Sequence, residues 1–314
     1  RLHVWDLEGT PDTWERQLAS HYARQPVFAA ISGLGGTEWS PVERFCEEQG
    51  LPCLFPNVDL PGTDPGRWYS FHYFRGLDLE AAVLAQHIQE SRGLRRVVQI
   101  ARPEGSGTRG AAALREALAA TGIVIEDRAF PGDAKTRSLA GLRKGDALVL
   151  WLGREDLAAL TRSPPPAVEI LVPGMLSGLE HAPLPPPWKR VAVMAYPYDP
   201  PGRWNLRMDR NLRPWLAQQG LARSDERLQG NTLAACNLLT ESMLRLRGRH
   251  FRDYLVEWVE NYPSAMGNAP APQAFPRFSL GPGQRFSSKG AYLVRFAAPD
   301  SKRLVPVQPD WIVP

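Results

Sequence analysis

Two cysteines, Cys46 and Cys53, frame the segment CEEQGLPC and offer the clearest covalent chemistry in this chain. If Cys46 ends a helix and Cys53 begins the next strand, the Gly-Leu-Pro turn brings their Cα atoms within disulfide range. The spacing fits a disulfide and equally fits two reduced, partly buried thiols, so both interpretations stay open. The third cysteine, Cys236, lies in an apolar helical pattern and is expected in the core. No Cys/His spacing predicts a metal site.

The residues that could perform catalysis form no recognisable motif. Ser106 lies in Gly-Ser-Gly, which lacks the Gly-x-Ser-x-Gly spacing of a hydrolase nucleophile. The glycines of residues 33–36 follow an apolar run but do not match the Gly-x-Gly-x-x-Gly dinucleotide loop. The dispersed histidines have no base or ligand spacing: His3, His21, His72, His87, His181 and His250. The sequence therefore indicates a protein that is not an enzyme and that needs no cofactor or metal.

The composition is that of a globular protein with one large or two medium domains. Of its 314 residues, 43% are hydrophobic and 22% charged, and the net charge of +4 comes from scattered arginines. Such dispersed charge does not predict nucleic-acid binding. No apolar stretch approaches the roughly 18 residues that span a bilayer. The sequence opens without the charged and apolar segments of a secretion signal, so any such signal is expected to have been removed or never present.

Short apolar runs alternate with amphipathic helical patterns up to residue 198. The apolar runs cover residues 2–5, 26–31, 54–55, 69–74, 97–101, 123–126, 147–151, 168–172 and 191–195. The helical patterns between them cover residues 12–23, 41–49, 78–91 and 108–121. β-Branched runs between helices favour parallel strands covered on both faces, which is an open α/β architecture. Beyond residue 198 we expect helices at 204–219 and 229–261 and a hairpin from 291 to 307.

Four segments together resemble the type I periplasmic substrate-binding proteins of the branched-chain amino acid (Leu/Ile/Val) class of ABC transporters. They are PVFAAISGLGGTEWSP at 26–41, LPCLFPNVD at 51–59, VVQIARPEGSGTRG at 97–110 and SLGPGQRFSSKGAYLVRF at 279–296. Their order along nearly the whole chain carries the resemblance. It implies an α/β fold of two lobes, each a mainly parallel sheet flanked by helices, with multiple crossovers between the lobes.

The resemblance also implies the domain boundaries. Lobe 1 is expected to comprise residues 1–92 and 203–278, and lobe 2 residues 93–202 and 279–314. The family's first lobe opens with a strand and a helix before the strand matched here by residues 2–6. That opening unit is missing from this sequence, and we expect an absent upstream piece rather than a rebuilt lobe.

Family members bind their ligand beyond the carboxyl ends of the strands, and the matching positions in lobe 1 lie in two loops. Gly36, Thr37 and Trp39 occupy a glycine-rich turn before a helix, where backbone N–H groups favour a carboxylate or another acceptor. The alternative is a tight turn with Trp39 packed on the core. Asn57 and Asp59 match the segment that contacts the α-amino and α-carboxylate groups of amino acids. Their alternative is an Asx-turn before a proline.

The candidates in lobe 2 are largely aromatic or neutral: Ser106, Trp151, Met175, Tyr196 and Tyr198. No acidic residue of this lobe is placed to pair with an ammonium group, because Glu104, Glu155 and Asp156 fit solvated loop or helix-start positions. The family implies an amino-acid-like ligand, whereas the aromatic bias, with Trp68 as a further member, favours a less polar or ring-bearing one.

We therefore expect a periplasmic solute-binding protein that captures a small molecule in the interlobe cleft by hinge closure. The resemblance implies delivery to an ABC-type membrane permease by a monomer that binds no nucleic acid. One alternative is a ligand sensor without transport, although no helix-turn-helix marks a transcriptional version. The other is an accessory protein with a degenerate pocket.

Overall fold

The fold is described from a computed structural model of the chain, which covers all residues except 37, 63–65, 92, 131–138, 161–167 and 267–272. The chain forms two compact units. Unit 1 comprises residues 1–75 and 202–288, and unit 2 comprises residues 76–201 and 289–314. The chain therefore passes from one unit to the other at residues 75–76, 201–202 and 288–289, which gives the multiple crossovers expected from the sequence.

The unit boundaries differ from the expected ones by more than one residue in two places. Helix α3 (Gly76–Glu90), expected in lobe 1, packs against α4 (Gly107–Leu118) and the sheet of unit 2. Residues 279–288, expected in lobe 2, extend the sheet of unit 1: the His72 amide donates to the Arg285 carbonyl at 2.8 Å, and the Ser287 amide to the His72 carbonyl at 3.0 Å. Contacts between residues far apart in the sequence decide where both segments pack, and a local sequence pattern does not contain that information.

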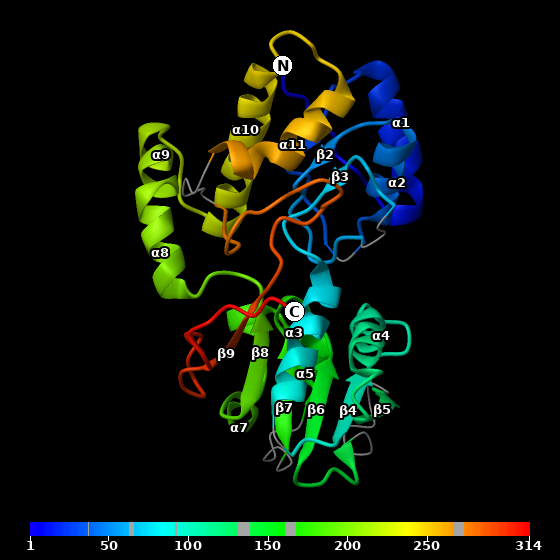
Figure 1. Cartoon of the computed structure of the whole chain (residues 1–314), viewed down its shortest axis with the longest axis vertical. Coiled ribbons are helices and arrows are strands. Elements are labelled where there is room, and N and C mark those ends of the chain that lie inside the picture. Colours follow the sequence, from blue (N-terminus) through cyan, green and yellow to red (C-terminus); the bar gives the residue numbers. More distant parts are fainter. Residues whose placement is uncertain (37, 63–65, 92, 131–138, 161–167, 267–272) are drawn as a thin grey trace. The chain divides into compact units, whose positions relative to one another are not determined.

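Unit 2 contains a seven-stranded sheet with the strand order β10-β9-β8-β7-β6-β4-β5 (Figure 1). The parallel strands are β4 (Arg96–Ala101), β5 (Val124–Ala129), β6 (Asp146–Trp151), β7 (Glu169–Pro173) and β8 (Ala192–Tyr196). The antiparallel pairs involve β9 (Tyr292–Phe296) and β10 (Leu304–Pro306). Val98, Leu148 and Leu171 of the central strands have no exposed surface, as expected for strands covered on both faces.

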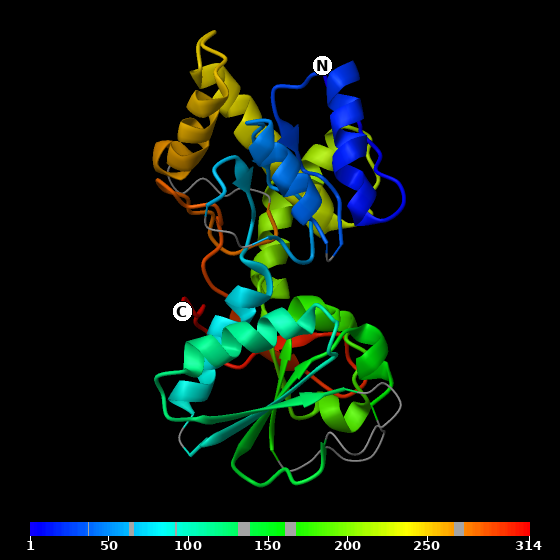
Figure 2. The same cartoon turned by 90° about the vertical axis from the view of Figure 1, so that its right-hand side faces the viewer.

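Helices α3 and α4 lie side by side against the unit 2 sheet (Figures 1 and 2). Glycines allow α4 to approach the end of β6 closely, because a Cβ atom on Gly107 would lie 2.1 Å from the Trp151 carbonyl oxygen. A Cβ on Gly110 would lie 2.4 Å from the Trp151 ring. The short helices are α5 (Arg154–Ala158), α6 (Gly174–Ser177), η3 (Leu179–His181) and α7 (Pro186–Lys189).

Unit 1 contains a parallel sheet of three two-residue strands, β1 (Ala30–Ile31), β2 (Cys53–Leu54) and β3 (Ser70–Phe71), in that order. Its helices are η1 (Pro11–Thr13), α1 (Trp14–Arg24), α2 (Ser40–Glu48), α8 (Pro201–Arg210), α9 (Leu212–Gln218), α10 (Glu226–Arg245) and α11 (Arg252–Met266). Residues 2–6 are not a strand, and Leu2 and Val4 are exposed. The absent opening unit stays a prediction.

Two further features of the described chain bear on function. Cys236, expected in the core, is exposed on α10, because Ala234, Ala235 and Leu238 supply the buried face of that helix. None of the described helices combines the length and the apolar character needed to cross a membrane.

Candidate functional site

The strands of unit 1 end in two loops that pair with each other. The Asn57 amide donates to the Gly33 carbonyl at 2.7 Å, and the Gly35 amide donates to the Asn57 carbonyl at 3.1 Å. Both glycines lie directly on the Trp39 ring, since an added Cβ atom would come within 2.7 Å and 2.5 Å of it. The glycine-rich turn is therefore shaped by the packing of Trp39 beneath it.

An uncharged hydrogen-bond network closes this carboxyl edge of unit 1. The Asn57 Nδ2 group donates to Ser32 Oγ at 2.9 Å, and Ser32 Oγ lies 2.7 Å from Thr232 Oγ1. Asn231 Nδ2 donates to Asn57 Oδ1 at 3.0 Å, while Asn231 Oδ1 accepts from the Ala274 amide at 2.9 Å. The first turns of α10 thus complete a site that begins at β1 and β2. These four residues are called the Asn57 network below.

Sequence reasoning found only Asn57 of this network. Ser32 lies in the first of the four segments that carry the resemblance but is not among the expected contacts, and Thr232 is 200 positions away from it. Asn231 is 4% exposed on a helix face that also buries Ala234, Ala235 and Leu238, so an asparagine in line with apolar residues is the available signal. Buried side-chain amides are nearly always bonded, and a partner of Asn231 could have been sought on that ground.

The other positions expected in unit 1 have different surroundings. Gly36 is exposed, and Thr37 lies outside the described residues. Trp39 is 8% exposed and packs edge-on against Trp14, with ring centroids 6.5 Å apart, which is the arrangement of the packed-turn alternative. Asp59 is exposed at the loop end, yet partial desolvation raises the pKa of its carboxyl. Gly36 and Asp59 are therefore accessible, and Trp39 supports them from below.

The expected positions in unit 2 lie at the carboxyl ends of β4, β6, β7 and β8. Trp151 is 1% exposed and donates its indole N–H to Gln99 Oε1 at 2.9 Å. Tyr196 is also buried, and its ring meets Tyr198 edge-on at 5.9 Å. Ser106 and Met175 are half-buried. The two groups with accessible surface are thus Ser106 and Met175, while the aromatic side chains fill the interior behind them.

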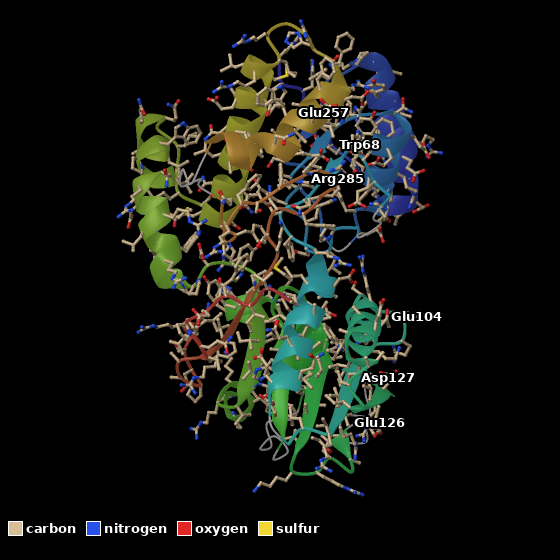
Figure 3. The ribbon with its side chains drawn as sticks, viewed as in Figure 1. Trp68, Glu104, Glu126, Asp127, Glu257 and Arg285 are labelled. Atoms are coloured by element: carbon tan, nitrogen blue, oxygen red, sulfur yellow. A yellow bond between two sulfur atoms is a disulfide. The ribbon has the colours of Figure 1, made fainter. Side chains whose placement is uncertain are left out.

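One of the acids considered for an ammonium partner is already engaged. Asp156 is buried and accepts from Arg102 in a bidentate pair, with Nε to Oδ2 at 2.8 Å. The Asp156 hydrogen bond raises the pKa of Arg102, whose side chain is 52% exposed. Glu155 is exposed, and Glu104 lies at the surface beyond β4 (Figure 3). Arg102 and Asp156 therefore neutralise each other at this edge, and the exposed carboxylates beside them are those of Glu104 and Glu155.

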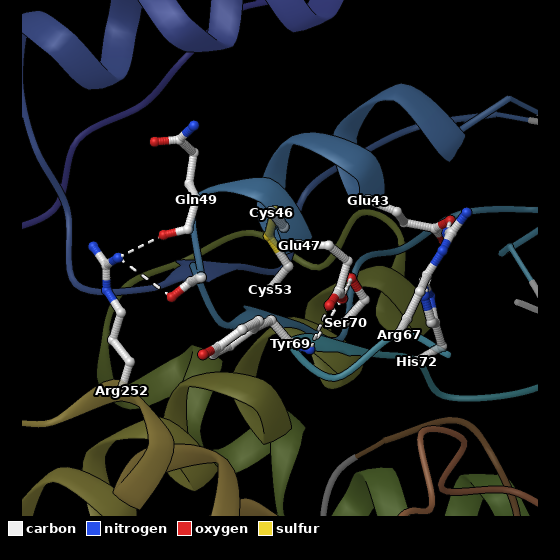
Figure 4. Close-up of a disulfide and its surroundings, with 11 residues drawn as sticks. Glu43, Cys46, Glu47, Gln49, Cys53, Arg67, Tyr69, Ser70, His72 and Arg252 are labelled. Atoms are coloured by element: carbon white, nitrogen blue, oxygen red, sulfur yellow. Dashed lines mark hydrogen bonds and ion pairs between the residues drawn. A yellow bond between two sulfur atoms is a disulfide. The ribbon is translucent and has the colours of Figure 1, made fainter. Parts of the chain in front are cut away.

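A disulfide joins Cys46 on α2 to Cys53 on β2, with Cα atoms 6.3 Å apart (Figure 4). Strand β2 leads directly into the loop that carries Asn57. On the other side of this bond, Glu47 accepts from the amides of Trp68 and Tyr69 and fixes the start of β3. The disulfide thus ties the helix before the site to the strand that positions it.

A buried ionisable cluster lies next to the disulfide. Glu43 pairs with Arg67, and His72 Nε2 lies 3.0 Å from Glu43 Oε1 (Figure 4). Burial, with the positive charge of Arg67 as the next cause, lowers the pKa of His72 to about 3. Arg285 nearby pairs with Glu260 and stacks on Trp68 and Phe71, at 4.7 and 4.6 Å from the ring centroids (Figure 3). The ring of Trp68 is thus covered by the guanidinium group of Arg285.

No family model and no curated protein matches this chain. Solved structures match it over nearly its full length. A branched-chain amino acid ABC transporter periplasmic ligand-binding protein from Burkholderia xenovorans aligns with a TM-score of 0.68 and 14% identity, covering 97% of this chain and 82% of its own. A branched-chain amino acid ABC transporter protein from Thermus thermophilus with bound valine aligns with a TM-score of 0.65 and 13% identity, covering 97% and 83%.

The chain has the type I periplasmic-binding-protein fold. A leucine-binding protein from Thermotoga maritima agrees with this, at a TM-score of 0.63 and 13% identity over 96% of this chain and 87% of its own. The fold class expected from the sequence, with mainly parallel sheets flanked by helices in two bodies, is confirmed. At such low identity the match establishes the fold, and what the chain binds has to be argued from its own residues.

Proposed function

We propose that this chain is an extracytoplasmic solute-binding protein of the branched-chain amino acid receptor type. It captures a small molecule through contacts from both units, by hinge closure, and delivers it to an ABC-type permease. The observation that carries the proposal is the fold shared over 97% of the chain with receptors of that type, one of them holding valine. A binding role without catalysis is the function of those neighbours.

The polar groups at the carboxyl ends of the strands in each unit support a ligand with one hydrogen-bonding group at its end. The Asn57 network supplies uncharged hydroxyl and amide groups, and the paired loops above Trp39 bring glycine backbone close by. In unit 2, Ser106 adds a hydroxyl and Met175 an apolar surface, while the guanidinium of Arg102 is paired with Asp156. The ligand that we propose has a carboxylate head and an apolar body, since hydroxyl and backbone N–H groups both donate to carboxylates.

The disulfide supports the location. Cystine bonds persist in oxidising compartments such as the periplasm and are rare in the cytosol. The Cys46–Cys53 bond lies within the part of unit 1 that positions Asn57, so it stabilises the loop that carries this residue. We propose a periplasmic location for the mature chain and a monomeric state, which leaves both units free to move on ligand binding.

The test is ligand-dependent stabilisation of the purified chain with valine, leucine and phenylalanine as probes. A ligand at 100 times its Kd raises the free energy of unfolding by about 2.7 kcal/mol. Asn57→Ala should raise at least tenfold the ligand concentration that gives this stabilisation, because it removes the side chain to which Ser32 Oγ and Asn231 Nδ2 are both bonded and so disorders the Asn57 network. Asn237→Ala, at an exposed position of α10, is the matched control.

A melting temperature that none of a broad set of amino acids and aromatic acids changes would overturn the proposal in favour of a degenerate pocket. Transport is tested separately by deleting the gene and measuring uptake of the bound ligand. Unchanged uptake with intact binding would favour the sensor alternative.

A further inference from the structure

Helix α3 places a carboxyl group inside unit 2, where none of it reaches solvent. Glu80 is 0% exposed, and its Oε1 atom accepts from the Met175 amide at 3.0 Å. The Gly174 amide is a second donor to this carboxyl. Glu80 Oε2 is also buried and has no hydrogen-bond partner among the described residues. A side chain from one helix thus holds the backbone at the carboxyl end of β7.

The corner that Glu80 holds is tightly built. A Cβ atom on Gly174 would lie 2.3 Å from the Ala195 carbonyl oxygen and 3.3 Å from Glu80 Oε1, so the corner lies directly against β8 and α3. Its chain then turns back through Gly178, whose amide donates to the Gly174 carbonyl at 3.0 Å and whose φ is +94°. Met175, one of the two half-buried candidates of unit 2, is carried by this corner.

No cation among the described residues balances a charge on Glu80. On α4, Arg109 pairs with Asp78 and Arg115 with Asp127. On β7, Glu169 pairs with His87 at 2.6 Å, and α6 contains no ionisable side chain. The Arg154 side chain of α5 lies against Gly178, at the other end of the corner, and does not act on the Glu80 carboxyl. Tyr196 of β8 faces Tyr198. Burial therefore dominates and raises the pKa of Glu80 to about 8, against which the two backbone amides act only partly.

We propose that Glu80 is a positioning residue for ligand binding, which fixes the Gly174–Ser177 corner while it carries a proton and releases the corner when it ionises. The inference rests on the proposed function, because Met175 acts there as a ligand contact. A buried carboxylate without a counter-ion is costly, and moving towards water relieves that cost. Such a movement breaks the bond to the Met175 amide and displaces the corner.

The consequence is a pH profile for ligand affinity. The pKa of about 8 belongs to the closed corner, whereas a carboxyl that reaches water titrates near its ordinary value of 4.5. Opening is therefore favoured up to about tenfold more for each pH unit between these two values, and gains nothing further above pH 8. The fraction of molecules with a closed corner, and with it the ligand affinity, should fall over that range and level off above pH 8. Glu80→Gln stays neutral and keeps an oxygen acceptor for both amides, so its affinity should not change over this range.

The experiment measures hydrogen exchange and valine and leucine affinity between pH 5 and 9.5. The protection factor of the Met175 amide should fall between pH 5 and 8 in the wild type, level off above pH 8, and stay constant in Glu80→Gln. Glu90→Gln, exposed at the end of the same helix, should behave as the wild type. Glu80→Ala should lose protection of the corner at every pH, and the wild-type exchange profile decides the matter if that variant does not fold.

The two possible failures are distinguishable. A Met175 amide equally protected in the wild type and Glu80→Gln at pH 9.5 refutes the inference, whatever binds. An affinity loss between pH 5 and 8 that persists in Glu80→Gln refutes it as well. If no probe binds the wild type at pH 5 while the amide shows the expected exchange profile, the proposed function fails and the anchoring role of Glu80 stands.

Discussion

The Cys46–Cys53 disulfide should make a large contribution to the stability of unit 1. Its cysteines are seven positions apart, and the chain-entropy relation gives about 2.4 kcal/mol at 25 °C for closing a loop of that length in the unfolded chain. In a unit of about 160 residues, each kcal/mol changes the melting temperature by about 2–4 °C. The Cys46→Ala/Cys53→Ala double variant should therefore melt about 5–10 °C lower than the wild type.

The assay is thermal unfolding combined with thiol titration. Of the three cysteines only Cys236 is free, so the unreduced denatured protein should titrate one thiol and the reduced protein three. Cys236→Ala is the control, and its exposed position should leave the free energy of unfolding within about 0.5 kcal/mol of the wild type. Three thiols without reductant, or a double variant that melts with the control, would refute the reasoning.

Two further predictions concern the interiors of the units. His72 is neutral in the fold, with a pKa of about 3, but takes up a proton near pH 6.5 when unfolded. The free energy of unfolding should therefore fall as the pH drops from 6.5 towards 3, by up to about 1.4 kcal/mol per pH unit. His72→Gln should remove that pH dependence in urea titrations. Equal slopes in the wild type and the variant would contradict a neutral, buried His72. Gly174→Ala should destabilise unit 2 by about 2 kcal/mol or more in the same assay, because its Cβ would lie 2.3 Å from the Ala195 carbonyl oxygen. Gly153→Ala, with open space around the added Cβ, should cost less than about 1 kcal/mol, and similar costs for both would show that the contact relaxes.

The amino-acid sequence alone determined the α/β class and the order of most elements. After Asp146, strand β6 is a continuous apolar run because both faces of its sheet are covered, and a run of consecutive apolar residues can be recognised in the sequence. The spacing of Cys46 and Cys53 is equally local, and the structure joins them in a disulfide. Each of these features depends on neighbours within a few positions, which a sequence pattern can represent.

The tertiary structure alone decided which polar groups meet at the edges of the sheets. Trp39 and Trp151 follow strands at positions that suit a ligand, yet both are buried because glycines of a neighbouring loop or helix let the chain close over them. Thr232 reaches Ser32 from 200 positions away, and Glu80 reaches the Met175 amide from another helix. Hydrogen bonds of this kind are fixed by how the elements pack, and packing depends on contacts between residues that the sequence keeps far apart.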